Sequence, residues 1–247
     1  MKKIITLLLT ATLTMTALAG CSKSGNNAGN TASSIDENKQ EIESTKTEQT
    51  QTEKALALID TFATGDTDIA KELLAEDYIQ HNLAYGTGRD AFISSVEYLA
   101  SADEKTTVEN IRAFEDGDKV FLQTVYNFAG AGEQVAFDIF RFDNKGKIAE
   151  HWDNLAAKAE PNPSGHTQID GTMEVTDLDK TEENRKLVED FLYDVMQGNN
   201  LDKTPDYFDG DTYIQHNTGI ADGVSGLNEV LAALAEQNIQ MIYTTSL

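Results

Sequence analysis

The chain has 247 residues, and its 42 Asp and Glu outnumber its 19 Lys and Arg, which gives a formal net charge of −23 at pH 7. Nucleic acid and anionic lipid headgroups repel so acidic a chain, so the composition argues against both as binding partners. The sequence contains one cysteine, so no disulfide can form within the chain and any folded domain must be held together by packing.

The first residues are typical of an exported protein. Lys2 and Lys3 precede an apolar, Thr-rich run that is too short for a good membrane span, and the run ends in Leu-Ala-Gly-Cys at residues 18–21. This ending resembles the lipobox of bacterial lipoproteins. The resemblance implies that residues 1–20 are a signal peptide, that Cys21 carries a lipid, and that the mature protein is anchored on the outer side of the cell membrane. An ordinary secretory peptide with a chance cysteine is the alternative.

Two stretches have the composition of flexible chain. Residues 21–51 contain two Ile and no aromatic residue, so they cannot bury enough apolar surface to fold and are predicted to be a disordered tether. Residues 159–180 contain two of the three prolines and are predicted to link two folded segments. His166 lies in this linker, where we expect it to be solvated and without a role.

The first folded segment is predicted at residues 52–158, with helices before strands. Thr50 and Glu53 have the spacing of a capping box, and apolar residues at helical spacing follow at Leu56, Ile59, Phe62 and Ala63. A short helix is predicted near residues 68–74 and a third helix at 88–102. Alternating residues then predict four strands, at 106–114, 119–128, 133–142 and 147–156. This order predicts an α+β fold in which a curved antiparallel sheet closes over three helices and encloses a pocket.

The pentapeptide Tyr-Ile-Gln-His-Asn occurs twice, at residues 78–82 and 213–217. Around the second occurrence, residues 181–247 repeat the helix, short helix, loop and third helix of the first segment, and a strand is predicted from Ile239. Most of the sheet has no counterpart there. We therefore expect an incomplete second copy of the first domain, in which His216 and Asn217 are the counterparts of His81 and Asn82.

Four motifs of the first segment, YIQHN, DIFR, GKI and EHWD, occur in an order that resembles the SnoaL-like polyketide cyclase family, in particular its branch predicted to catalyse aldol condensation. This family belongs to the nuclear transport factor 2-like superfold, which includes ketosteroid isomerase. The resemblance implies a cone-shaped α+β barrel around a small-molecule cavity and chemistry without a cofactor. It says little about the substrate, because the fold carries enzymes and binding domains alike.

The resemblance also implies a set of site residues. Asp138 occupies the position of the protonated carboxylic acid that donates a hydrogen bond in ketosteroid isomerase, which is a known example of that role. His81 falls where the isomerase has its general base, and His151 and Asp153 share one face of the last strand. The catalytic candidates are therefore His81, Asp138, His151 and Asp153, and the pocket candidates are Tyr78, Asn82, Phe140, Trp152 and Leu155.

These residue types suit enolisation of a carbonyl compound. A base removes a carbon-bound proton, and a hydrogen-bond donor stabilises the oxygen on which negative charge develops. No metal is expected, because the spacing of the His and Asp residues matches no strong ligand signature.

Each candidate also has a structural interpretation. His81 and Asn82 can simply hold a loop through hydrogen bonds to the backbone. Asp138 can be a buried polar group whose hydrogen bonds are all made within the protein. Trp152 can belong to the cavity wall or to the core without a specific contact to a ligand. Arg141 and Glu150 are expected to form an ion pair on the outer face of the sheet.

Three functions stay open on the sequence alone. The first is a cofactor-independent cyclase, isomerase or lyase-like enzyme that acts on an apolar or carbonyl-containing small molecule. The second is a binding domain that uses the same cavity without turnover. The third is a dimerisation module, either between two chains or between the two copies within one chain.

Overall fold

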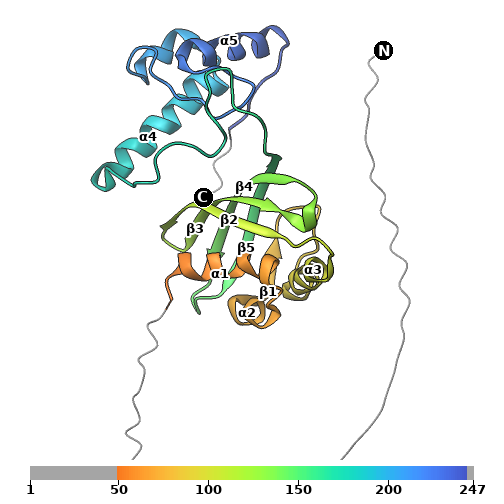
Figure 1. Cartoon of the computed structure of the whole chain (residues 1–247). Coiled ribbons are helices and arrows are strands. Elements are labelled where there is room, and N and C mark those ends of the chain that lie inside the picture. Colours follow the sequence, from red (N-terminus) through yellow and green to blue (C-terminus); the bar gives the residue numbers. More distant parts are fainter. Residues whose placement is uncertain (1–48, 244–247) are drawn as a thin grey trace, which may run out of the picture. The chain divides into compact units, whose positions relative to one another are not determined.

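A computed structural model describes residues 49–243 (Figure 1). The predicted signal peptide, Cys21 and nearly all of the predicted tether lie outside the described residues. Within residues 49–243, no helix is both long and apolar enough to cross a membrane.

The first domain is built on one five-stranded sheet with the order β1-β5-β4-β3-β2. Four consecutive strands pair antiparallel, as predicted: β2 (Thr107–Asp116), β3 (Lys119–Asn127), β4 (Glu133–Phe142) and β5 (Ile148–Ala157). Breaks in the register between Asn110 and Arg112 and between Arg141 and Phe142 are the kind of irregularity that bends a sheet. The sheet is therefore curved and open.

The expectation of a wholly antiparallel sheet is wrong at one edge. Strand β1 (Leu74–Gln80) pairs parallel with β5, and its register shifts between Leu74 and Ile79. The sequence pattern hides this strand because two acidic residues, Glu76 and Asp77, interrupt its apolar positions. The strand also follows a helix without a break. Its addition matters because it places the first YIQHN motif directly beside β5.

Three helices pack against the inner face of this sheet: α1 (Gln51–Thr64), α2 (Thr67–Leu73) and α3 (Arg89–Ser101). The predicted capping box is confirmed, since the Thr50 hydroxyl accepts the Glu53 backbone N–H and the Glu53 carboxylate accepts the Thr50 N–H. The core contains Leu58 from α1, Val96 from α3 and Phe140 from β4, all fully buried. Helices and sheet thus enclose one apolar interior.

Strand alternation sorts residues between the two faces of the sheet. On β4, Asp138, Phe140 and Phe142 are buried, whereas Phe137 and Ile139 are 45% and 37% exposed. Asp138 lies opposite Asp153 on β5, and Arg141 lies opposite Glu150. The inner face therefore carries two carboxylates side by side, and the outer face carries the predicted ion pair.

The regular elements of the described part of the second segment are all helices, joined by irregular loops. It contains α4 (Thr181–Phe191), the π-helical turn η3 (Leu192–Gln197), the 3-10 helix η4 (Leu201–Asp206) and α5 (Gly223–Glu236). A small cluster of Val195, Leu227 and Leu231 forms its core. The predicted helices are present, but no strand forms between Ile239 and Tyr243, where the description ends. That the segment is a second copy of the first domain stays a prediction.

Candidate active site in the first domain

A cavity of about 480 Å³ lies between the helices and the inner face of the sheet. Much of its wall is aromatic, from Phe62, Tyr78, Tyr85, Phe92, Tyr98, Tyr126 and Phe128. Its polar wall includes the side chains of Asp138, His151, Asp153 and Gln80. An apolar cavity with a few converging polar groups is the usual form of a small-molecule site.

The alternation of β5 decides which predicted residues reach this cavity. His151, Asp153 and Leu155 face inward and line it, as expected from their spacing. Trp152 lies between them and therefore points to the outer face. Its prediction as a pocket residue is wrong.

The inward-facing acid–base groups form one connected cluster. His151 Nε2 lies 3.1 Å from Asp138 Oδ1, and the Tyr126 hydroxyl donates to Asp138 Oδ2 at 3.0 Å. Asp153 Oδ2 is 3.8 Å from the same imidazole nitrogen. Both oxygens of Asp138 therefore have partners. This geometry favours Asp138 as a hydrogen-bond acceptor that positions His151. It does not favour the role predicted from the resemblance, in which Asp138 donates a hydrogen bond to a ligand.

The end of β1 and the loop that follows it hold this cluster from the other side. The Asn82 side-chain amide donates to Asp153 Oδ1, and Gln80 Nε2 lies 3.0 Å from His151 Nδ1. Asn82 does not line the cavity but positions a residue that does. Gln80 and Tyr126 were not among the predicted site residues. Alternation on β1 would have placed Gln80 beside Tyr78 on the inner face, had that strand been recognised.

His81 lies on the outer face of the sheet, so its prediction as the general base in the cavity is wrong. Its ring stacks on Trp152 with centroids 4.3 Å apart, and its Nε2 is 2.8 Å from Glu150 Oε2. Arg141 binds the other oxygen of Glu150, which confirms the predicted outer ion pair. His81 follows the inward-facing Gln80, so the period of two places it outside.

Phe140 is fully buried and does not line the cavity. Its ring stacks against the His151 imidazole, with centroids 4.2 Å apart. Its prediction as a pocket residue is therefore wrong in detail. It supports the cluster from behind, within the core.

Burial gives the cavity groups unusual proton affinities. Desolvation raises the pKa of the Tyr78 hydroxyl, with a further contribution from the Asp153 and Asp138 charges, so this hydroxyl keeps its proton. Desolvation also raises the pKa of the Asp153 carboxyl, against the opposing effects of His151 and Asn82. A carboxyl with a raised pKa and a protonated hydroxyl on one cavity wall are a possible base and a possible hydrogen-bond donor.

Two carboxyls on β5 should titrate in opposite directions. We expect Asp153 to titrate above its ordinary 3.8, because burial favours the protonated form. We expect Glu150 to titrate below its ordinary 4.5, because hydrogen bonds from His81 and Arg141 favour the carboxylate. Carbon-13 NMR of the side-chain carboxyls as a function of pH measures both values in one sample.

The two shifts have opposite effects on stability. The contribution of Asp153 is present below pH 3.8 and is lost as the pH rises through its folded-state pKa. The contribution of Glu150 is present above pH 4.5 and is lost as the pH falls through its folded-state pKa. An Asp153 value at or below that of Glu150 would contradict the buried position of Asp153.

The same cluster is the one group of three or more His, Cys, Asp or Glu residues among residues 49–243 whose ligand atoms could hold a single metal ion. Single ligand atoms of Asp138, His151 and Asp153 all lie within 4.8 Å of one another. Two carboxylates and an imidazole could hold a divalent cation if the imidazole nitrogen that faces them were free of a proton.

The second YIQHN motif folds into the same loop as the first. In each copy a glycine N–H donates to the Tyr carbonyl oxygen, from Gly88 to Tyr78 at 2.9 Å and from Gly223 to Tyr213 at 2.7 Å. In each copy the Asn N–H also donates to the Gln side-chain oxygen, from Asn82 to Gln80 Oε1 at 2.9 Å and from Asn217 to Gln215 Oε1 at 2.8 Å. The motif therefore encodes a loop by itself, which supports the structural interpretation of the Asn in both copies.

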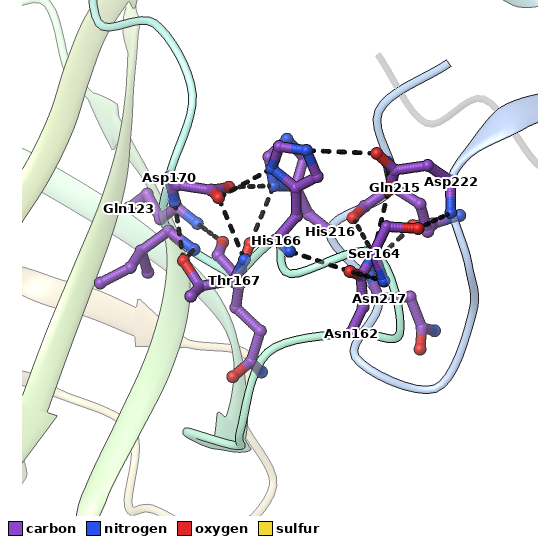
Figure 2. A network of polar contacts seen from close by, with 12 residues as sticks. Gln123, Asn162, Ser164, His166, Thr167, Asp170, Gln215, His216, Asn217 and Asp222 are labelled. Carbon is purple, nitrogen blue, oxygen red and sulfur yellow. Dashed lines mark hydrogen bonds and ion pairs between the residues drawn. The ribbon is translucent and has the colours of Figure 1, made fainter. Parts of the chain in front are cut away.

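The surroundings of the second loop differ from those of the first. Figure 2 shows His216 against the linker, with its Nδ1 2.8 Å from Asp170 Oδ1 and 2.9 Å from the Thr167 carbonyl oxygen. His166 lies between two carboxylates, 3.0 Å from Asp170 Oδ2 and 3.2 Å from Asp222 Oδ2. The expectation that His166 is solvated and idle is wrong, since it binds the linker to the second loop.

Asn162 is the buried anchor of this linker contact. It is 4% exposed, its amide donates to the Gln215 carbonyl oxygen and to Asp222, and its side-chain oxygen accepts the N–H groups of Ser164 and His166. Asn162→Ala leaves buried partners unpaired, so we expect a loss of about 1–3 kcal/mol in the local stability of the loop. Faster hydrogen–deuterium exchange of the backbone amides in residues 214–223 would show this loss of stability.

The matched control is Asn144→Ala, which changes an exposed residue in the turn between β4 and β5. It should leave exchange in residues 214–223 unchanged. Equal exchange in wild type and Asn162→Ala would mean that the linker does not stabilise the second loop.

Comparison with known families identifies the first domain. Residues 55–151 match the family described as SnoaL-like domain. No curated protein is similar enough to this chain to count as a match.

Solved structures of similar fold include three with different descriptions. An NTF2-like protein of unknown function from Cytophaga hutchinsonii is 20% identical with a TM-score of 0.39, over 45% of this chain and 94% of that one. IdmH from Streptomyces antibioticus, provisionally described as a polyketide cyclase, is 19% identical with a TM-score of 0.36, over 43% and 92%. An LEH-like epoxide hydrolase from M. tuberculosis is 15% identical with a TM-score of 0.39, over 43% and 82%.

Proposed function

Residues 55–151 form a SnoaL-like domain, and we propose that its cavity binds a neutral, largely apolar carbonyl compound and transfers a proton on it by means of the protein's own side chains. The observation that carries this proposal is the position of Asp153, a buried carboxylate on the wall of an aromatic cavity, with one oxygen held by Asn82. The other oxygen accepts no hydrogen bond from the described residues and is therefore available to a ligand.

Asp153 is the proposed base. It removes a proton from the carbon next to the carbonyl group, and its raised pKa brings it nearer to neutral pH, where a carboxyl base is more effective. The electrons of the broken C–H bond move into the enolate, whose oxygen receives the negative charge. The same carboxyl can return the proton to another carbon.

Tyr78 is the proposed donor to that oxygen. Its hydroxyl is 3.4 Å from Gln80 Nε2, which donates to it, so the hydroxyl proton remains available for a ligand. Burial raises its pKa and keeps it protonated. A donor aimed at the developing charge stabilises the transition state more than the ground state.

The cavity chemistry favours neutral ligands over anions. Asp138 and Asp153 face the cavity, and no Lys or Arg lies on the described cavity wall. A ligand carboxylate or phosphate would meet two like charges in an apolar environment, which is unfavourable.

Proton–deuterium exchange tests the proposal without knowledge of the natural substrate. Acetophenone, cyclohexanone and tetralone are incubated with the protein in D2O, and NMR follows loss of the protons next to the carbonyl. We expect exchange above the buffer rate for at least one of these ketones. Exchange at the buffer rate for all of them, although NMR shows that they bind in the cavity, would favour binding without turnover.

Binding without turnover is the second candidate, and the outer position of His81 favours it. The predicted base is absent from the cavity, and Asp138 and His151 have partners of their own. Mass spectrometry of small molecules that co-purify with the protein would reveal a retained ligand in either case.

Dimerisation through the outer sheet face is a third candidate. Phe114 stacks on Phe121 with centroids 4.7 Å apart, and Phe121 approaches Phe137 at 5.7 Å. Phe114 and Phe137 are 47% and 45% exposed. Light scattering would show a dimer that Phe137→Lys dissociates, and a monomeric wild type would exclude this function.

We also propose that the protein acts on the outer side of the cell membrane, anchored through a lipid on Cys21. The support is the sequence Leu-Ala-Gly-Cys at residues 18–21 after a short apolar run. Cys21→Ser should move the protein from the membrane fraction to the soluble fraction. Retention in the membrane fraction would exclude this anchor.

A further inference from the structure

We propose that Gln80 is a positioning residue that fixes the tautomer of His151, with the ring proton on Nε2. The hydrogen bonds of the Gln80 carboxamide carry this inference. Its consequence for proton transfer rests on the proposed function, but the tautomer itself does not.

The orientation of the Gln80 carboxamide is decided by the backbone. Its Oε1 accepts the N–H of Asn82 at 2.9 Å, and an amide NH2 group in the same place could not accept. The second copy repeats this bond, from Asn217 N–H to Gln215 Oε1 at 2.8 Å. The loop therefore requires the oxygen of this glutamine to face its own backbone.

The NH2 group of Gln80 must then face the imidazole. Gln80 Nε2 is 3.0 Å from His151 Nδ1, and it can only donate. Nδ1 must therefore be the nitrogen without a proton, and in the neutral ring the proton is on Nε2. From there it is directed to Asp138 Oδ1, at 3.1 Å.

This tautomer assigns different roles to the two inward-facing carboxylates. Asp138 accepts from Nε2–H and from the Tyr126 hydroxyl, so its oxygens are engaged. Asp153 has its Oδ2 3.8 Å from Nε2, beyond a hydrogen bond. Gln80 thereby leaves Asp153 as the carboxylate that can accept a proton from a ligand.

The same proton disfavours a metal at this cluster. A metal-binding imidazole needs a free lone pair on the coordinating nitrogen, and Nε2 is the nitrogen that faces both Asp138 and Asp153. With the proton on Nε2, the three groups form a hydrogen-bonded cluster in place of a ligand set.

Nitrogen-15 NMR of the histidine rings tests the assignment directly. At about pH 8.5, well above the ordinary imidazole pKa of about 6.5, the spectrum distinguishes protonated from unprotonated ring nitrogens. We expect His151 to show a protonated Nε2 and an unprotonated Nδ1 in the wild-type protein. A protonated Nδ1 would overturn the proposal, and this result needs no variant.

Gln80→Glu should put a proton on Nδ1. A carboxylate at this position can only accept, and Asp138 Oδ1 still accepts from Nε2–H, so Nδ1 gains a proton while Nε2 keeps its own, and the Nδ1 signal changes to that of a protonated nitrogen. Gln215→Glu is the matched control, since it makes the same change in the second copy, and it should leave the His151 signals as they are.

An unchanged His151 spectrum in a folded Gln80→Glu protein would overturn the proposal. If Gln80→Glu does not fold, Gln80→Met serves in its place, because it keeps the size of the side chain and removes the donor. We expect a mixture of both tautomers in that variant, whereas a single unchanged tautomer would mean that Asp138 alone fixes the ring.

Discussion

Asp153→Asn should lower the rate of ketone proton exchange by roughly 10²–10⁴-fold, the usual contribution of a positioned general base. The amide has nearly the shape of the carboxylate, and its oxygen can still accept from Asn82, as Asp153 Oδ1 does. It cannot accept a proton from carbon. The expected loss is therefore one of chemistry and not of cavity shape, and NMR-detected exchange in D2O measures it.

Glu150→Gln is the matched control for this change. Glu150 lies on the same strand, three positions earlier, but faces outward and binds His81 and Arg141. The rate of ketone proton exchange with Glu150→Gln should equal that with the wild type. Equal rates of ketone proton exchange with Asp153→Asn and with the wild type would exclude Asp153 as the base. A loss of exchange in Glu150→Gln alone would indicate that the site is on the outer face of the sheet.

Phe140→Ala should reduce the free energy of unfolding of the first domain by about 3–5 kcal/mol, the usual range for a buried Phe replaced by Ala. The side chain is 0% exposed and stacks on His151. Its removal opens a void in the core beneath the acid–base cluster. Urea unfolding followed by the fluorescence of Trp152, the one tryptophan of the sequence, reports on this domain.

Phe137→Ala is the control because it removes the same side chain from the same strand on the opposite face. Phe137 is 45% exposed, so we expect a loss of about 1 kcal/mol or less. Similar losses of unfolding free energy in Phe140→Ala and Phe137→Ala would contradict the placement of Phe140 on the buried face of β4 and of Phe137 on its exposed face.

The four antiparallel strands could be predicted because each combines alternating residues with a turn signal at its end. Alternation also placed His151, Asp153 and Leu155 on one face, and the structure has all three on the cavity wall. The parallel edge strand β1 could not be found in this way. Its register with β5 depends on a partner about 70 residues away, and a pattern of local periodicity does not contain that partner.

The missing strand explains the errors in the site. The sequence analysis predicts no strand at residues 74–80, so it has no alternation that would show the direction of His81, and only the resemblance places His81 in the cavity. On a strand, Tyr78 and Gln80 share the inner face and His81 turns outward to Trp152. The sequence predicts that β3 pairs with β4 but does not give the register of the pair, so it does not show that the Tyr126 hydroxyl reaches Asp138.

The repeated pentapeptide was a sound indication of local structure. Its Gln and Asn residues form the same loop hydrogen bonds in both places, whatever surrounds them. The role of each loop depends on its neighbours. The first lies against β5 and holds His151 and Asp153, whereas the second lies against the linker and contacts Asp170.

A crystal structure of the protein with the ketone that exchanges fastest would test the proposed site most directly. We expect the ketone inside the cavity of the first domain, with its carbonyl oxygen within hydrogen-bond distance of the Tyr78 hydroxyl and the neighbouring carbon against the free oxygen of Asp153. A ketone bound beside Trp152 on the outer face, or turned with its carbonyl away from Tyr78 and Asp153, would contradict the proposal.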